Sequence, residues 1–75
     1  MRYLVKAIYT ARYNGKQYFY YYGKDGRSTK NLSESFIDKY SYVSENGAKR
    51  NWYYRNPETD DVYYEKSVEI MEVVR

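Results

Sequence analysis

Apolar and polar residues alternate along the first segment of the chain. The odd positions from Tyr3 to Tyr13 are all aromatic or small apolar residues, whereas the even positions mix apolar, polar and basic side chains. A period of two is typical of a β-strand with one buried face. The pattern predicts a strand over residues 2–13, whose odd positions form an inner face and whose even positions form an outer face.

A hairpin is predicted directly after this strand. The dipeptide Asn14-Gly15 is the strongest short hairpin signal, because both residues tolerate the positive φ of a type I′ turn. Residues 16–22 then return as the second strand. A two-residue turn fixes the register, so residue 13 is expected opposite residue 16. The inner-face pairs predicted by this register are Ala7–Tyr22, Tyr9–Tyr20 and Ala11–Tyr18.

The middle of the chain has helical spacing. After a turn-rich loop over residues 23–28, apolar side chains recur at the spacing of a short helix between residues 32 and 40, with Asn31 or Ser33 as its cap. Residues 44–56 fit two structures. Ser44 as a cap and Pro57 as a stop indicate a helix, whereas Asn46-Gly47 is also a hairpin turn signal.

We favour the helix for residues 44–56, because Lys49, Arg50 and Asn51 are weak strand formers. On this interpretation Ala48 and Trp52 lie one turn apart and both face the sheet. A turn is predicted over residues 57–61. The segments 62–64 and 68–74 are predicted as strand, with a bulge near Lys66 as one way to join them.

These elements predict one small domain over residues 1–75. The fold class is α+β: an N-terminal β-hairpin, a helical middle and a C-terminal strand that completes an antiparallel sheet. The alternative is an all-β domain with two Asn-Gly hairpins.

The composition indicates that aromatic rings supply most of the buried apolar surface. Leu, Ile, Val and Phe supply only 13 of 75 residues, whereas there are 13 tyrosines, and each aromatic ring can bury on the order of 150–250 Å². One small core cannot readily cover that much aromatic surface. We therefore expect self-association, most simply as a two-fold homodimer.

Charge is distributed unevenly along the chain. Residues 1–30 carry seven basic side chains and one acidic one, whereas residues 56–75 carry six acidic and two basic ones. Two interpretations follow. Either the two ends pair in one sheet and partly neutralise each other, or the basic first third meets nucleic acid or an acidic protein surface.

The chain has no Cys and no His, which excludes disulfides, thiol catalysis and the usual acid–base group near neutrality. The glycine-containing loop over residues 23–29 lacks the spacing of a phosphate-binding loop. We therefore expect no enzymatic activity, no metal and no cofactor.

No apolar run approaches about 20 residues, and the first residues lack a signal-type stretch, so we expect a cytoplasmic protein with no membrane partner.

The outer face of the hairpin is the candidate binding surface. It combines Phe19 and Tyr21 with Lys6 and Arg12, and these two cations are costly to bury without partners. Aromatic and basic residues are enriched at protein–protein hot spots. The same combination on a sheet also holds single-stranded nucleic acid. We expect a macromolecular partner at this face, with a protein favoured over nucleic acid.

Three short stretches carry a family resemblance: TKNLSES at 29–35, SENGAKR at 44–50 and VEIMEV at 68–73. In these stretches the chain resembles small accessory proteins of phages and prophages in low-GC Gram-positive bacteria. The resemblance implies an opening hairpin, a closing strand and no catalytic residues. It also implies a stoichiometric binder or inhibitor that acts on a host or phage protein.

Overall fold

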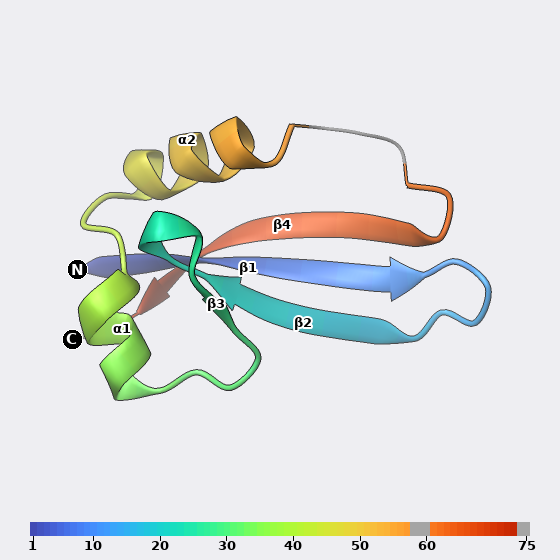
Figure 1. The fold of residues 1–75 in the computed structure, drawn as a ribbon, viewed down its shortest axis with the longest axis horizontal. Coiled ribbons are helices and arrows are strands. Elements are labelled where there is room, and N and C mark those ends of the chain that lie inside the picture. The colour runs from blue at the N-terminus through green and yellow to red at the C-terminus, as the bar shows by residue number, and fades with distance from the viewer. Residues whose placement is uncertain (58–60, 74–75) are drawn as a thin grey trace.

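The computed structural model describes residues 1–57 and 61–73, which form one four-stranded antiparallel sheet with two helices (Figure 1). The elements in chain order are β1 (Arg2–Ala11), β2 (Gln17–Tyr22), the 3-10 turn η1 (Lys24–Gly26), β3 (Ser28–Thr29), α1 (Glu34–Tyr40), α2 (Glu45–Arg55) and β4 (Tyr64–Val73). The strand order is β3-β2-β1-β4, so β1 is paired on both sides. The predicted α+β class is confirmed, with a helix and not a second hairpin over residues 45–55.

The predicted register of the β1–β2 hairpin is wrong by two residues. Ala11 N–H donates to the Lys16 carbonyl (2.8 Å) and Gly15 N–H donates to the Ala11 carbonyl (2.8 Å), so the connection is a four-residue loop. A type I′ turn needs positive φ at both Asn14 and Gly15, but only Gly15 has it, at 73°. The observed inner-face pairs are Val5–Tyr22, Ala7–Tyr20 and Tyr9–Tyr18.

Pairing of β1 with the segment that begins β4 accompanies the wider turn. Arg12 N–H donates to the Tyr63 carbonyl (2.9 Å), so β1 continues its pairing toward β4 after it has left β2. The Asn14 side chain accepts from Lys16 N–H (2.9 Å) and closes the loop. Because the shift is an even number of residues, the side chains of β1 and β2 keep their predicted faces.

The helix caps form as the sequence indicates. The Ser33 hydroxyl accepts from Phe36 N–H and begins α1, and the Ser44 hydroxyl accepts from Gly47 N–H and begins α2. In α2, Ala48 and Trp52 are buried and pack against Val5 and Ala7 of β1. The Trp52 ring also meets the Tyr22 ring edge-on, with centroids 4.8 Å apart.

Tyr42 completes the inner face next to β1 where β2 has ended. Its backbone exchanges two hydrogen bonds with Tyr3 (2.8 and 2.9 Å), although it lies outside the named strands. Its hydroxyl lies 3.0 Å from the Gly23 carbonyl and 2.8 Å from Oδ1 of Asn51 in α2. Gly23 is required here, because a Cβ would collide with the backbone of Tyr40. The sequence pattern did not predict this bridge or β3.

β4 pairs with β1 in one continuous register from Arg2–Val73 to Ala11–Tyr64, so the expected bulge near Lys66 is absent from the described strand. The predicted turn over residues 57–61 lies mostly outside the described residues, as does position 74 of the predicted strand.

Replacement of Trp52 with Ala tests the packing of α2. Trp52 is only 3% exposed, so we expect Trp52→Ala to lower the free energy of unfolding by about 3–5 kcal/mol. Tyr54→Ala in the same helix is the matched control, since Tyr54 is 84% exposed and a change there costs less than about 0.5 kcal/mol. Urea denaturation followed by circular dichroism measures both. Equal midpoints for the two variants would contradict the packing of α2 described above.

Candidate functional site

The inner face of the sheet is only half covered by helix. α2 lies over the half where β1 begins, as Figure 1 shows, and its buried side chains meet Val5 and Ala7. Beyond Ala7 the inner face continues through Tyr9 to the end of β1. The partly exposed tyrosines of this second half come from β1, β2 and β4: Tyr9, Tyr18, Tyr20 and Tyr64. Tyr22 lies at its border, beside Trp52.

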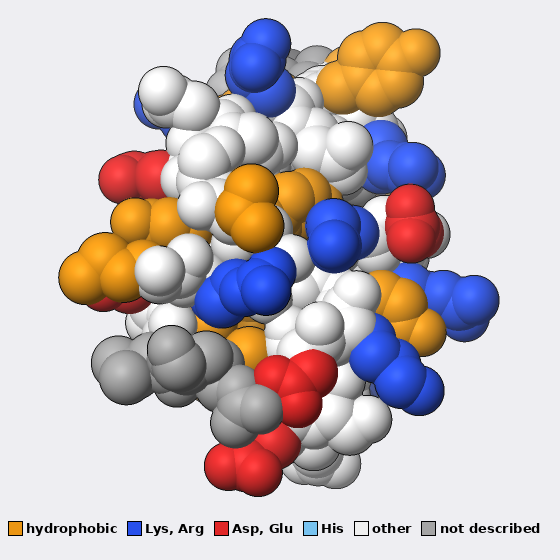
Figure 2. Space-filling view, turned by 90° about the vertical axis from the view of Figure 1, so that its left-hand side faces the viewer, with side chains coloured by type: hydrophobic (Ala, Val, Ile, Leu, Met, Phe, Trp, Pro, Cys, Tyr) orange, Lys and Arg blue, Asp and Glu red, His pale blue; other side chains and the backbone are white. Residues whose placement is uncertain are grey.

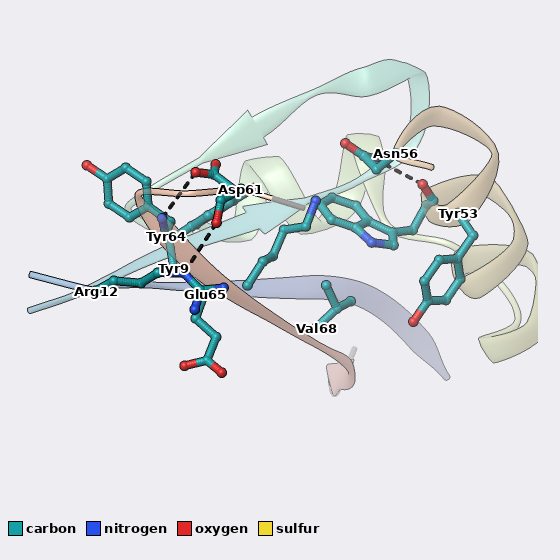
Figure 3. Close-up of a pocket in the computed structure, with 10 residues that line it drawn as sticks. Tyr9, Arg12, Tyr53, Asn56, Asp61, Tyr64, Glu65 and Val68 are labelled. Atoms are coloured by element: carbon teal, nitrogen blue, oxygen red, sulfur yellow. Dashed lines mark hydrogen bonds between the residues drawn. The ribbon is translucent and has the colours of Figure 1, made fainter. Parts of the chain in front are cut away.

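These rings line two adjoining cavities that we call the tyrosine groove. The first cavity, of about 510 Å³, extends from the end of α2 at Tyr53 and Asn56 across to Arg12 and Tyr64 (Figure 3). The second, of about 480 Å³, is lined by tyrosines of β2 together with Lys30. The two cavities share the walls made by Tyr9, Asp61 and Tyr64.

The rings in the groove contact one another through edges. Tyr9 meets Tyr20 in a T-shaped arrangement at 5.7 Å between centroids, and Tyr18 meets Tyr64 in the same way at 6.3 Å. The hydroxyls of Tyr9 and Tyr22 lie 3.2 Å apart and share a hydrogen bond. In a T-shaped pair one ring presents its edge and the other its face. The ring faces that are not occupied in this way are available to a flat ligand.

Three lysines lie beside rings of this face. Lys16 Nζ is 5.9 Å from the Tyr18 ring centre and Lys30 Nζ is 5.3 Å from the Tyr20 ring centre. Lys66 Nζ lies 5.7 Å from the ring centre of Trp52. An ammonium within about 6 Å of a ring face is attracted to it. The groove therefore combines aromatic walls with nearby ammonium groups.

Asp61 fixes one wall of the groove. Its carboxylate accepts from the N–H groups of Tyr63 (2.8 Å) and Tyr64 (3.1 Å), and its carbonyl accepts from Arg12 Nε (3.2 Å). Figure 3 shows the bonds of Asp61 with Tyr64 and Arg12 at one end of the cavity, with the Glu65 carboxylate directed away from Asp61. The charged side chains that line the two cavities are Arg12, Lys30 and Lys66 together with Asp61 and Glu65.

Four residues were predicted to form one binding surface, Lys6, Arg12, Phe19 and Tyr21, and the structure brings three of them together. Lys6 and Tyr21 are cross-strand partners, and Lys6 Nζ lies 5.0 Å from the Phe19 ring centre. Arg12 does not join them, because it lies in the loop after β1 and its side chain reaches Asp61 in the groove. We call the surface made by Lys6, Ile8, Phe19, Tyr21 and Glu69 the open face.

The open face is more neutral than its sequence suggests. Lys6 forms an ion pair with Glu69 of β4 at 3.8 Å, which agrees with the expectation that the two ends of the chain pair and partly neutralise each other. Phe19 is 42% exposed. Elsewhere, at the end of the molecule where β1 begins, Figure 2 shows Lys and Arg side chains interspersed with hydrophobic ones.

The tyrosine groove was missed at the sequence level because its residues share the parity of the core. One signal was available: a helix of 13 residues or fewer cannot cover a strand of ten or more residues. Such a helix rises about 1.5 Å per residue, against about 3.3 Å per residue in a strand. A helix over residues 44–56 therefore leaves about half of the inner face of the sheet uncovered.

Within residues 1–57 and 61–73 there is no cluster of three or more His, Cys, Asp or Glu side chains that would hold a metal ion. Among the same residues, no helix has the length and apolarity needed to cross a membrane. Comparisons with protein-family models, with curated proteins and with solved structures found no match to this chain.

The tyrosine pair at the groove leads to a prediction about pH. Burial, and then the hydrogen bond with Tyr9, raise the pKa of Tyr22 above its ordinary value of 10.0, and burial also raises the pKa of Tyr42. A raised pKa in the folded state gives stability that is fully present below pH 10 and is lost as the pH rises above it. We expect the free energy of unfolding to fall more steeply between pH 9 and about 11 in the wild type than in Tyr22→Phe.

Urea denaturation at a series of pH values measures this difference. Tyr13→Phe is the matched control, since Tyr13 is 78% exposed, and it should retain the wild-type slope. Parallel pH profiles for the wild type and Tyr22→Phe would show that Tyr22 ionises equally well in the folded and unfolded chains.

Proposed function

We propose that this chain is a non-catalytic protein that binds single-stranded nucleic acid in the tyrosine groove. One observation carries the proposal: partly exposed tyrosine rings line a concave surface with lysines beside them. Single-strand binders combine these two features, since bases stack on aromatic rings while cations follow the backbone. In this groove Tyr20 with Lys30, and Tyr18 with Lys16, each place a ring and an ammonium within 6 Å of each other.

The size and charge of the groove support the same proposal. Cavities of about 510 and 480 Å³ fall within the roughly 300–1,000 Å³ of typical ligand sites. The chain has a formal net charge of +3, which favours a polyanion over a neutral ligand. Lysines on long flexible stems can move from a ring to a phosphate when a base takes their place.

Adjacent tyrosines of β2 provide the test, because Tyr20 faces the groove and Tyr21 faces the opposite side of the sheet. Each is replaced with Ala, and binding to a fluorescently labelled oligothymidine is measured by anisotropy. We expect Tyr20→Ala to lose about 1–3 kcal/mol of binding free energy, the contribution of one stacked base. Tyr21→Ala should bind like the wild type, with circular dichroism to confirm that both variants fold.

The salt dependence of affinity distinguishes the contribution of Lys30 to binding from that of the aromatic rings. Lys30→Ala should lower the slope of log affinity against log salt concentration by about 0.7, the value for one phosphate contact on a single strand. Wild-type affinity in Tyr20→Ala, or an absence of binding at low salt, would exclude the groove as a nucleic-acid site.

The open face supports a second candidate function, the binding of a protein partner. It exposes Phe19 beside Ile8 and Tyr21, while its one cation, Lys6, is already paired with Glu69. An aromatic surface with little net charge suits a protein hot spot better than a polyanion. By the family resemblance, the partner would be a host or phage protein that this chain inhibits by stoichiometric binding.

Pull-down from the source cell tests this second function. Phe19→Ala should lose a partner that the wild type retains at a fixed ratio and over a wide range of salt. Tyr20→Ala is the matched control and should retain it. Loss of the partner in Tyr20→Ala alone would assign protein binding to the groove instead.

A further inference from the structure

The outer edge of β4 has an arrangement of backbone groups that the sheet does not use. Residues of β1 with odd numbers bond toward β2, as Ala11 N–H does to Lys16, and those with even numbers bond toward β4, as Arg12 N–H does to Tyr63. In an antiparallel pair the N–H and C=O of one residue point to the same side. In the β1–β4 register even residues of β1 lie opposite odd residues of β4. The even residues of β4 therefore direct their backbone groups outward.

Most of these outward groups have no backbone partner among residues 1–57 and 61–73. Tyr64 N–H is taken by Asp61 at the start of the strand, but no backbone hydrogen bond from another described segment reaches Lys66, Val68, Ile70 or Glu72. β4 is the last strand of the sheet and is ten residues long. A long edge of this kind is a template for pairing with another strand.

We propose that a second copy of the chain occupies this edge, with the two β4 strands antiparallel about a two-fold axis at Val68. Because the outward residues are centred on Val68, this register pairs Lys66 with Ile70 of the other copy and Val68 with Val68, and it places Tyr64, whose N–H is bonded to Asp61, opposite Glu72. The result is one continuous sheet of eight strands. It leaves both α2 helices and both tyrosine grooves on the same side.

Backbone pairing and like charges together distinguish this register from its neighbours. A shift of two residues in one direction places Glu69 opposite Glu69, although it also places Lys66 opposite Glu72. The same shift in the other direction places Glu65 opposite Glu69. Like charges directly opposite each other destabilise a strand pair. With Val68 on the axis, Glu69 lies opposite Ser67 and diagonal to Glu65 and Glu69 of the other copy, while Lys66 is a diagonal neighbour of Glu72. This register is centred on the outward groups of β4 and places no like charges directly opposite each other.

Single cysteines test the register, because the natural chain has none. In Val68→Cys the two thiols lie on the axis, in a pair with Cα atoms about 5.5 Å apart, which is inside the range for a disulfide. In Ser67→Cys the two thiols are diagonal neighbours about 7–8 Å apart, too far to bridge. We expect mild oxidation to join Val68→Cys into a dimer and to leave Ser67→Cys monomeric.

A mixed experiment covers the case in which Val68→Cys, which is partly buried, does not fold. Ser67 and Glu69 are both exposed, and an equimolar mixture of Ser67→Cys and Glu69→Cys should form the heterodimer disulfide. Sedimentation of the wild type should return about twice the chain mass of 9.2 kDa. The proposal is overturned by a wild-type monomer at all concentrations, by equal cross-linking of Ser67→Cys alone, or by a dimer that neither cysteine arrangement joins.

Discussion

The length of α2 is the constraint on which the rest of this molecule depends. Its 11 residues rise about 16 Å, whereas the ten residues of β1 extend about 33 Å. One helix of this length covers one half of the inner face and no more. Trp52 marks the border between the covered and uncovered halves. Its ring contacts Tyr22 on β2, and Lys66 of β4 lies over it.

The uncovered half explains the composition of the chain. Tyrosine can pack its ring against a neighbour and still present a hydroxyl to water, so a row of tyrosines suits a surface that is neither core nor solvated. Tyr9, Tyr18 and Tyr20 occupy that surface and contact one another or Tyr64 through T-shaped pairs. The open face solves a different problem, since Lys6 neutralises Glu69 there and leaves Phe19 partly exposed. The two faces therefore suit ligands of different charge.

Local signals predicted most of the fold. Alternation assigned each side chain of β1 and β2 to its face, and Ser33 and Ser44 begin the two helices as hydroxyl caps do. The hairpin register was not predictable from Asn14-Gly15, because the pairing of Arg12 with Tyr63 decides where β1 leaves β2. That pairing joins residues 51 positions apart, and no local pattern encodes it.

The candidate site was predicted less well than the fold, for the same reason. Parity alone places Tyr20 in the core, and only the position of α2 shows that it lies beyond the helix. Arg12 was assigned to the outer face by its even number, but the loop carries its side chain to Asp61. Lys30 follows β3, a strand of two residues that is too short to give a periodic signal, so its place beside Tyr20 required the three-dimensional structure.

The central claim is that aromatic rings on the inner face contact a single strand, and ring-proton NMR tests it most directly. Side chains alternate along β2, so Tyr18 and Tyr20 face the groove while Phe19 and Tyr21 face the opposite side. The rings of Phe19 and Tyr21 therefore serve as internal controls for those of Tyr18 and Tyr20. Titration with an oligothymidine should shift the ring resonances of Tyr18 and Tyr20 and leave those of Phe19 and Tyr21 in place. Shifts confined to Phe19 and Tyr21, or no ring shifts at saturating oligonucleotide, would contradict the account.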